Sequence, residues 1–175
     1  MIEIRWHARA GQGAKTAAHL FALATLRSGQ SAQAFPEYGP ERRGAPVRAY
    51  TRIDGRPIRR HDSVTRPDAV VVLDPSLLAE PTVAEGLDAK TLVLADGDDT
   101  LASLDGTRIV SVPASQLAAG TGTKFVNLVM AGALAAALGE PPLEEVEDAA
   151  AEVLGTKAGE EAVRAAVEEG YRWLS

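Results

Sequence analysis

The stretch IEIRWHARAGQGAKTAAHLFALATLRSG, residues 2–29, contains a strand pattern, a turn and a helix pattern in succession. Apolar and polar residues alternate over 2–7, which predicts a first strand. Small residues and glycines at 8–13 predict a turn, and the alanine- and leucine-rich segment 14–27 predicts a helix that stops at Gly29. A strand, a tight turn and a helix in this order are typical of an α/β fold.

The rest of the chain alternates between strand and helix patterns. Short apolar runs predict three parallel strands buried on both faces, at 69–74, 91–96 and 107–113. Three helices are predicted at 124–138, 143–154 and 159–173. Two less regular strands are predicted at 33–35 and 47–53, and Asp54–Gly55 predicts a tight turn that returns at 57–59. We therefore predict a single α/β domain over residues 1–175, with a mostly parallel, Rossmann-like sheet flanked by helices and an added antiparallel hairpin.

Composition excludes several classes of protein. The 175-residue chain is 46% hydrophobic, which suffices for one sizeable core. Its net charge of -6 argues against non-specific nucleic-acid binding. Arginines nevertheless cluster within 42–60, which indicates a local anion site or an acidic partner surface. The absence of cysteine excludes disulfides and thiolate-held iron–sulfur clusters in this chain. No apolar run is long enough for a membrane span and the N-terminus lacks a signal-peptide pattern, so we expect a cytoplasmic protein.

The glycine turn alone leaves its role open. A dinucleotide-binding turn needs a third glycine after Gly11 and Gly13 and an acidic residue about 20 positions later, and both are missing. Lys15–Thr16 follow the turn as in a P-loop, but the first glycine of that motif is absent. The alternative is an architectural role, in which glycines permit positive φ angles and close packing of the helix on the strand. Free amides at the helix start are also compatible with a bound anion.

Two motifs together resemble one family. The segment IRWHARAGQGAKTAAHLFA, followed by QAFPEYGPERRGAPVRAYTRI, resembles the gamma subunit, or gamma domain, of pyruvate- and 2-ketoisovalerate-type 2-oxoacid:ferredoxin oxidoreductases. Downstream, FVNLVMAGALAAALG resembles the asparagine-bearing helix of that family and EEAVRAAVEEGYRWL its closing helix. Ala8 and Ala10 depart from the pattern because the family usually has glycines there. The added Cβ atoms limit how closely a ligand can approach this turn.

The resemblance implies the function of a complex. Such enzymes oxidatively decarboxylate a 2-oxoacid, such as pyruvate or a branched-chain 2-oxoacid, to acyl-CoA and reduce ferredoxin. Thiamine diphosphate, iron–sulfur clusters and coenzyme A (CoA) are expected in the assembled complex and none in this chain. The implied partners are alpha, beta and delta (ferredoxin-like) subunits, with no nucleic acid and no membrane. This chain would be inactive alone, would shape the active-site and CoA cleft, and would expose an apolar patch when isolated. The alternative is a stand-alone nucleotide- or small-molecule-binding α/β protein that uses the Gly11–Gly13 turn.

The candidate binding residues come from the turn, from the 36–44 loop and from the asparagine-bearing helix: Gly11, Gln12, Gly13, Tyr38, Glu41, Arg42, Arg43 and Asn127. Guanidinium groups bind phosphate or carboxylate bidentately, so the resemblance implies that the loop faces the catalytic partner near the CoA or substrate entrance. The alternative is a solvated, salt-bridged loop. Asn127 is predicted to hydrogen-bond to the turn after the first strand, because a buried amide needs partners; ligand contact is the alternative. No residue is predicted to be catalytic or to bind metal, since three scattered histidines lack ligand spacing.

Overall fold

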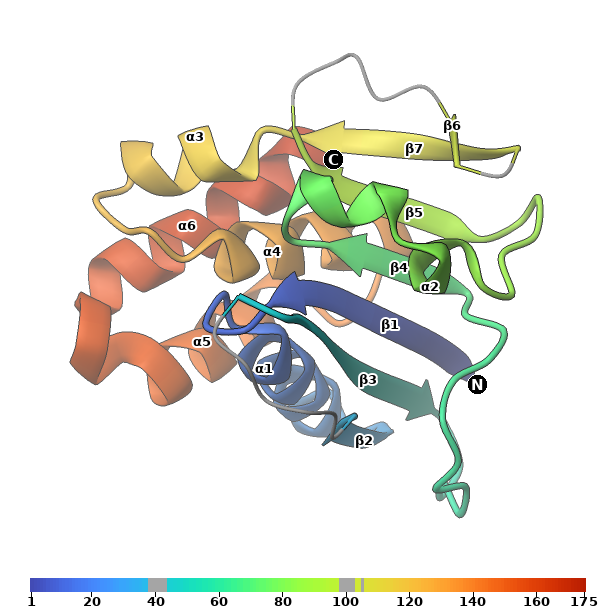
Figure 1. Ribbon diagram of the computed structural model, residues 1–175. Coiled ribbons are helices and arrows are strands. Elements are labelled where there is room, and N and C mark those ends of the chain that lie inside the picture. Colours follow the sequence, from blue (N-terminus) through green and yellow to red (C-terminus); the bar gives the residue numbers. More distant parts are fainter. Residues whose placement is uncertain (38–43, 98–102, 105) are drawn as a thin grey trace.

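The computed structural model describes residues 1–37, 44–97, 103–104 and 106–175 (Figure 1). Its strands are β1 (Ile2–Arg9), β2 (Ser31–Pro36), β3 (Pro46–Asp54), β4 (Ala69–Val72), β5 (Leu92–Asp96), β6 (Ser103–Leu104) and β7 (Thr107–Val112). Its helices are α1 (Ala14–Arg27), α2 (Pro81–Ala84), α3 (Ala114–Gly120), α4 (Val126–Leu138), α5 (Leu143–Ala158) and α6 (Glu160–Leu174), with a 3-10 helix, η1, at Pro75–Ala79. The alternation of strands and helices confirms the predicted α/β class.

The strands form one sheet in the order β2–β3–β1–β4–β5–β7–β6. The pairs β1–β4, β4–β5 and β5–β7 are parallel, as the continuous apolar runs predicted. Strand β3 is antiparallel to both β1 and β2, so β2 runs in the same direction as β1. Among the described strands only β3 and β6 oppose this direction, which confirms the mostly parallel sheet.

The predicted return strand at 57–59 is wrong. Residues 57–61 have no regular secondary structure, and the antiparallel hairpin is formed by β2 and β3 instead. Both hydrogen-bonding edges of β3 are already occupied, by β1 on one side and β2 on the other, so no edge remains for a third strand. Pro57 also lacks the amide that a paired strand needs.

One face of the sheet carries the main core. Residues of β1, α1, α4, α5 and α6 form a continuous buried cluster, and Figure 1 shows these helices on one side of the strands. Within it, the rings of Trp6 and Phe21 meet edge to face with centroids 5.9 Å apart. The indole Nε1 of Trp6 donates to Thr51 Oγ1 at 3.0 Å, which satisfies its buried polar atom.

The opposite face has a smaller core under η1 and α2. Val70 and Val72 of β4 pack there with Leu77 and Val83. This half of the sheet is therefore apolar on both faces, as its sequence predicted. Within the described residues, no helix is long and apolar enough to cross a membrane.

Candidate functional site

The turn between β1 and α1 is built on two glycines in the left-handed region. Gly11 has φ 98° and Gly13 has φ 90°, conformations that residues with a Cβ rarely adopt. Gln12 stabilises the turn through two hydrogen bonds to Arg9. Its side-chain Oε1 accepts from the backbone amide of Arg9 at 2.7 Å, and its backbone amide donates to the Arg9 carbonyl at 3.0 Å. The turn is thus held closed by its own residues.

The two alanines that replace family glycines are accommodated by the fold. Ala8 belongs to β1, where it pairs with Val47 and is fully buried. The amide of Ala10 donates to the carbonyl of Ala45 at 2.9 Å, so it is not free for a ligand. Their Cβ atoms therefore leave the conformations of Gly11 and Gly13 intact.

Gln12 also connects the turn to the next parallel strand. Its Nε2 donates to Asp74 Oδ2 at 2.9 Å, at the carboxyl end of β4. Arg9 reaches the same place, with its guanidinium on Ser76 Oγ at 2.7 Å and its Nε 3.5 Å from Asp74. Burial raises the pKa of Asp74, but hydrogen bonds from Ser76 and Gln12 and the charge of Arg9 together lower it below its ordinary value. Asp74 is therefore an ionised group that orders the ends of both strands.

Helix α1 begins with unused donors. The first backbone bond of the helix joins the amide of Ala17 to the carbonyl of Gly13 at 2.8 Å. The three preceding amides have no partner within the helix, and no side chain of the described residues caps it. Its first turn contains no acidic residue. This helix start is therefore able to accept a negatively charged group.

Asn127 at the start of α4 packs directly against the turn. Its Nδ2 lies 3.4 Å from the carbonyl oxygen of Gly13, and the residue is 2% exposed. This confirms the predicted hydrogen bond between the asparagine-bearing helix and the turn. A Cβ on Gly13 would lie 2.8 Å from the same Nδ2 and would push the Asn127 amide aside, and the positive φ of Gly13 independently favours glycine. The other amide atom, Oδ1, is buried and has no hydrogen-bond partner among the described residues.

A pocket of about 290 Å³ opens beside this contact. It is lined by Gly11, Gln12, Leu73, Lys124, Phe125 and Val126. It lies at the carboxyl ends of β1 and β4. The chain leaves β1 into α1 on one face of the sheet and leaves β4 into η1 on the other face. Open parallel sheets bind ligands at such a switch point. Lys124 is exposed and forms no ion pair within the described part of the chain, so a positive charge stands at the pocket.

The structure brings together Gly11, Gln12, Gly13 and Asn127. The other four candidates, Tyr38, Glu41, Arg42 and Arg43, lie outside the described residues. The residues that flank this segment, Glu37 and Gly44, lie at the same end of the sheet as the glycine turn. The carbonyl of Gly44 accepts from Arg9 NH1 at 3.1 Å, and Glu37 pairs with Arg48 at 2.6 Å.

Sequence reasoning missed Arg9, Asp74 and Lys124. Asp74 is the first polar residue after an apolar strand, which was a usable signal for the carboxyl end of β4. It also missed the buried pair Arg5 and His7 on the other face of β1, where Arg5 Nε donates to His7 Nε2 at 2.9 Å. Burial, together with the charges of Arg5 and Arg48, lowers the pKa of His7 to about 3, so its imidazole is neutral.

Acidic residues do not assemble a metal site in the described structure. No group of three or more histidine or acidic side chains there has the geometry to hold an ion. Asp96, which ends β5, accepts hydrogen bonds from the amide and hydroxyl of Ser115 at the start of α3. Its carboxylate therefore serves as a helix cap.

Comparison with known proteins gives consistent matches over nearly the whole chain. Residues 3–173 match the sequence pattern of the pyruvate ferredoxin/flavodoxin oxidoreductase family. The chain is 41% identical to the pyruvate/ketoisovalerate oxidoreductases common subunit gamma of Pyrococcus furiosus, over 96% of this chain and 95% of that one. The crystal structure of the pyruvate oxidoreductase subunit PORC of Thermotoga maritima superposes with a TM-score of 0.84 at 36% identity, over 98% of this chain and 95% of that one.

A more distant structure shares the fold only. The 2-oxoglutarate:ferredoxin oxidoreductase of Magnetococcus marinus, solved with 2-oxoglutarate, CoA and succinyl-CoA bound, gives a TM-score of 0.76 at 18% identity. The match covers 99% of this chain but 31% of that one. The same fold is therefore found both as a separate chain and as part of a longer one.

Proposed function

Since the chain belongs to the pyruvate ferredoxin/flavodoxin oxidoreductase family, we propose that it helps to form the CoA and active-site cleft of a multi-subunit 2-oxoacid:ferredoxin oxidoreductase. It is the gamma-type subunit of such a complex. In the reaction, the 2-oxoacid loses CO₂, its acyl group passes to the CoA thiol, and two electrons reduce ferredoxin. The 2-oxoacid is pyruvate or a branched-chain analogue, and the complex is placed in the cytoplasm as part of the same proposal.

The redox and carbanion chemistry is assigned to the alpha, beta and delta subunits. Iron–sulfur clusters require thiolate ligands, and this sequence has no cysteine. Thiamine diphosphate needs a metal-bound diphosphate site, whereas the Asp96 carboxylate is already engaged by Ser115. We therefore assign both cofactors to the partner subunits and a role in binding and positioning to this chain.

The pocket beside the glycine turn fits part of a CoA molecule. The ammonium group of Lys124 suits a phosphate, and Leu73, Phe125 and Val126 supply apolar walls. The free amides of α1 begin two residues beyond Gln12, next to the pocket, and favour an anion there. Asn127 does not line the pocket but packs against the glycine turn beside it, so its assigned role is to hold that turn in place. A volume of about 290 Å³ holds only part of CoA, so a partner subunit must supply the rest of the site.

The 38–43 segment belongs to the same proposal. Tyr38, Glu41, Arg42 and Arg43 are assigned to the entrance of the cleft, facing the catalytic partner. One arginine pairs with Glu41 or with a partner carboxylate, and the other binds an anionic group of the substrate or of CoA. Support comes from Glu37 and Gly44, which flank this segment and lie at the end of the sheet that carries the pocket.

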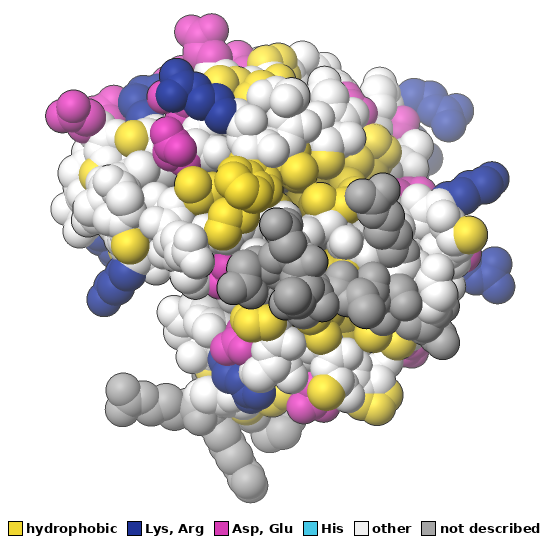
Figure 2. All heavy atoms as spheres, turned by 90° about the horizontal axis from the view of Figure 1, so that it is seen from above, with side chains coloured by type: hydrophobic (Ala, Val, Ile, Leu, Met, Phe, Trp, Pro, Cys, Tyr) yellow, Lys and Arg dark blue, Asp and Glu magenta, His cyan; other side chains and the backbone are white. Residues whose placement is uncertain are grey.

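The surface of the isolated chain is compatible with a buried subunit interface. Figure 2 shows hydrophobic side chains gathered on the face that carries β7 and α3. Trp173 at the end of α6 is 48% exposed, and its Nε1 donates to the carbonyl of Ser111 at 3.3 Å. Exposed aromatic and apolar groups on one face are typical of protein–protein contact sites.

The single observation that carries this proposal is the near end-to-end match with separate gamma subunits. It is tested by affinity purification of the tagged chain from its native host. We expect thiamine- and iron–sulfur-containing partners, with dye reduction that requires both a 2-oxoacid and CoA. In that complex, Arg42→Glu should raise KM for CoA or lower activity. A lone, colourless chain would contradict the proposal. A thermal shift of that lone chain with NAD or ATP would favour a stand-alone nucleotide-binding protein.

A further inference from the structure

A positively charged surface lies at the end of the sheet opposite to the pocket. Residues 55–66 connect β3 to β4 at the amino ends of the parallel strands, and Figure 1 shows them as a loop that projects away from the helices. This segment, which we call the basic arm, contains four arginines, one histidine and one aspartate, and no lysine. It is separate from the pocket, which lies at the carboxyl ends of the strands.

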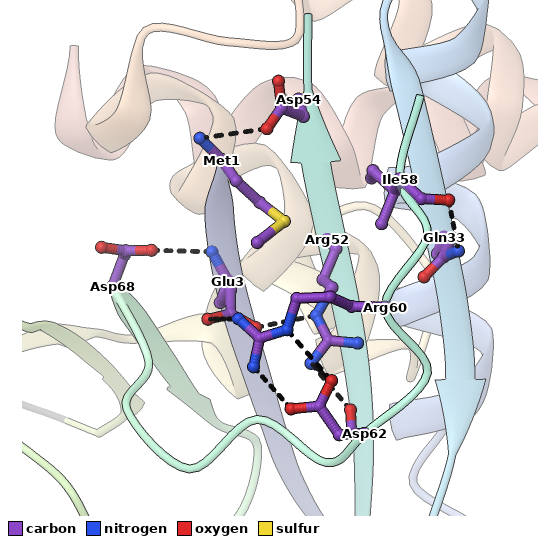
Figure 3. Close-up of polar contacts among 9 residues, drawn as sticks. All are labelled: Met1, Glu3, Gln33, Arg52, Asp54, Ile58, Arg60, Asp62 and Asp68. Carbon is purple, nitrogen blue, oxygen red and sulfur yellow. Dashed lines mark hydrogen bonds and ion pairs between the residues drawn. The ribbon is translucent and has the colours of Figure 1, made fainter. Parts of the chain in front are cut away.

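The basic arm is anchored although it has no regular secondary structure. Figure 3 shows Arg52 of β3 reaching both Glu3 and the arm. Arg52 is fully buried, its Nε donates to Glu3 Oε1 at 2.7 Å, and its NH2 donates to the carbonyl of Asp62 at 2.7 Å. Gln33 of β2 donates to the carbonyl of Ile58 at 3.2 Å, and Val64 is only 3% exposed. The arm is therefore held at several points along its length.

The far end of the arm is fixed by close backbone packing. Gly86 lies so near it that a Cβ there would be 1.8 Å from the carbonyl oxygen of Thr65. This contact positions the backbone just before Arg66. A partner that binds the arm therefore does not have to order it first, which lowers the entropic cost of association.

The carboxylates around the arm are already engaged, as Figure 3 shows. Glu3 pairs with Arg52 and Arg60, Asp62 pairs with Arg60, and Asp54 lies 3.4 Å from the N-terminal amine. Asp68 accepts from the amide of Glu3 at 2.8 Å. These four carboxylates stand against five arginines of 52–66 and the N-terminal amine, so the surface around the arm keeps a net positive charge.

The outward cations of the arm are Arg56, Arg59 and Arg66. The side chain of Arg56 is 90% exposed and lies 3.9 Å from Asp54, a weak pairing. Arg59 and Arg66 are exposed and form no ion pair with any described residue. Exposed guanidinium groups on an anchored backbone suit the planar, bidentate recognition of carboxylates.

We propose that the basic arm docks onto an acidic protein surface of another subunit of the complex, an inference that rests on the proposed function. The use of arginine without lysine favours a protein partner, because interfaces are enriched in arginine and depleted in lysine. The rest of the molecule argues against nucleic acid, since the net charge is -6 and the basic stretch is short. The segment 140–175, which contains α5 and α6, carries ten acidic and three basic residues. An acidic partner surface is therefore attracted to the arm and repelled by these two helices.

The test compares two double variants of equal charge change. Arg59→Glu/Arg66→Glu reverses the arm, and Lys157→Glu/Arg172→Glu reverses two exposed cations on α5 and α6. The partner subunits that co-purify with the wild-type chain are the probe, titrated against each variant at low and physiological salt. We expect the arm variant to bind at least about tenfold more weakly, with a shallower salt dependence. The control should stay within about twofold of the wild type.

The outcomes separate the arm from the proposed function. The arm variant should unfold at the wild-type temperature, since Arg59 and Arg66 make no ion pair with a described residue. The control loses the exposed pairs of Arg172 with Glu168 and Glu169, a small cost that leaves the protein folded. An assembled, active wild type together with unimpaired assembly of the arm variant overturns the arm proposal alone. A wild-type chain that binds no partner subunit overturns both. Micromolar binding of duplex DNA by the wild type, lost in the arm variant, would assign the arm to nucleic acid and overturn a protein partner.

Discussion

Gly13 and Asn127 are 114 residues apart in sequence, yet one hydrogen bond between them holds α4 against the turn. The lack of a side chain on Gly13 is what allows the amide of Asn127 to approach. Gly11, two positions earlier, has a similar φ but open space where its Cβ would stand. A comparison of alanine substitutions at the two positions therefore separates the free-energy cost of the backbone conformation from that of the steric clash.

We predict that Gly13→Ala destabilises the protein more than Gly11→Ala. Both changes impose about 1–2 kcal/mol for an alanine in the left-handed region, and Gly13→Ala adds the clash with Asn127. Urea unfolding of both variants measures the difference. In an Asn127→Ala background the excess cost of Gly13→Ala should shrink, because the clashing amide is gone. Equal costs of the two alanines in the wild-type background would contradict this account.

The contact between Gly13 and Asn127 was predictable because a single amide in an apolar helix needs a partner. The bonds of Gln12 and Arg9 to Asp74 and Ser76 were not, because they depend on which strand lies beside β1. Sequence patterns predict that a strand exists and which of its residues are apolar. They do not give the order of strands in the sheet, and that order decides which polar residues meet at its edge.

His7 makes stability depend on pH. Its pKa is about 3 in the folded protein and 6.5 when unperturbed. The unfolded chain therefore binds one more proton between these values, and the free energy of unfolding falls as the pH drops through this window. The loss attributable to His7 is at most about 1.4 kcal/mol per pH unit. Its stabilising contribution is complete above pH 6.5.

We predict that His7→Gln flattens the pH dependence of stability. Glutamine can still accept from Arg5 but does not titrate. Urea unfolding at several pH values from about 5 to 7 should give a smaller slope for the variant than for the wild type. Carboxylates with low pKa values, such as Asp62 at about 2, contribute little in this range. Parallel slopes for the two proteins would show that His7 is not the titrating group.

At the level of elements, burial decided which predictions succeeded. The apolar runs of β4 and β5 predicted strands because a strand covered on both faces has no polar side to reveal. The third run became β7, whose Val110 and Ser111 are only half-buried. Helix α4 is buried on all sides from Asn127 to Ala135 and contains no charged residue, as its apolar sequence indicated. The hairpin at Asp54–Gly55 failed because a local turn signal cannot show that β1 and β2 already occupy both edges of β3.

Helices α4 and α6 cross at two glycines, which allows their backbones to touch. A Cβ on Gly170 would lie 1.9 Å from the carbonyl oxygen of Val129, and one on Gly132 would lie 2.0 Å from that of Val167. We predict that Gly170→Ala costs about 3 kcal/mol or more, because two packed helices must separate. Gly155→Ala in α5 is the matched control, since its nearest neighbour would be 3.8 Å away.

The control should gain stability. Alanine is favoured over glycine inside a helix by about 1 kcal/mol when nothing obstructs it. Thermal or urea unfolding of both variants therefore should give changes of opposite sign. A mild effect of Gly170→Ala would mean that α6 can shift without loss, and that the close crossing does not fix its position.

On the scale of the whole molecule, the fold divides an arginine cluster that looks continuous in sequence. Arg48 pairs with Glu37, Arg52 is fully buried, and Arg56, Arg59 and Arg60 lie on the basic arm. The sequence suggested one anion site or acidic partner surface within 42–60. Strand β3 runs antiparallel to β1, from the carboxyl ends of the parallel strands to their amino ends. Residues near 44 and residues near 60 therefore lie at opposite ends of the sheet. The cluster therefore does not form one patch.

This separation predicts that the pocket and the arm act independently. Lys124→Ala removes the positive charge at the pocket and should raise KM for CoA about three- to tenfold in the assembled complex, with Lys157→Ala as the control. The arm variant Arg59→Glu/Arg66→Glu should weaken assembly and leave KM for CoA unchanged once the complex is saturated.

The effects of substitutions at well-separated sites with no shared partner usually combine additively, within about twofold. In the triple variant, KM should therefore carry the Lys124 effect alone and the dissociation constant of the partner subunits the arm effect alone. A KM effect of Lys124→Ala that disappears in the arm variant would mean that both ends contact one partner through a shared rearrangement, and the two surfaces would have to be treated as a single site.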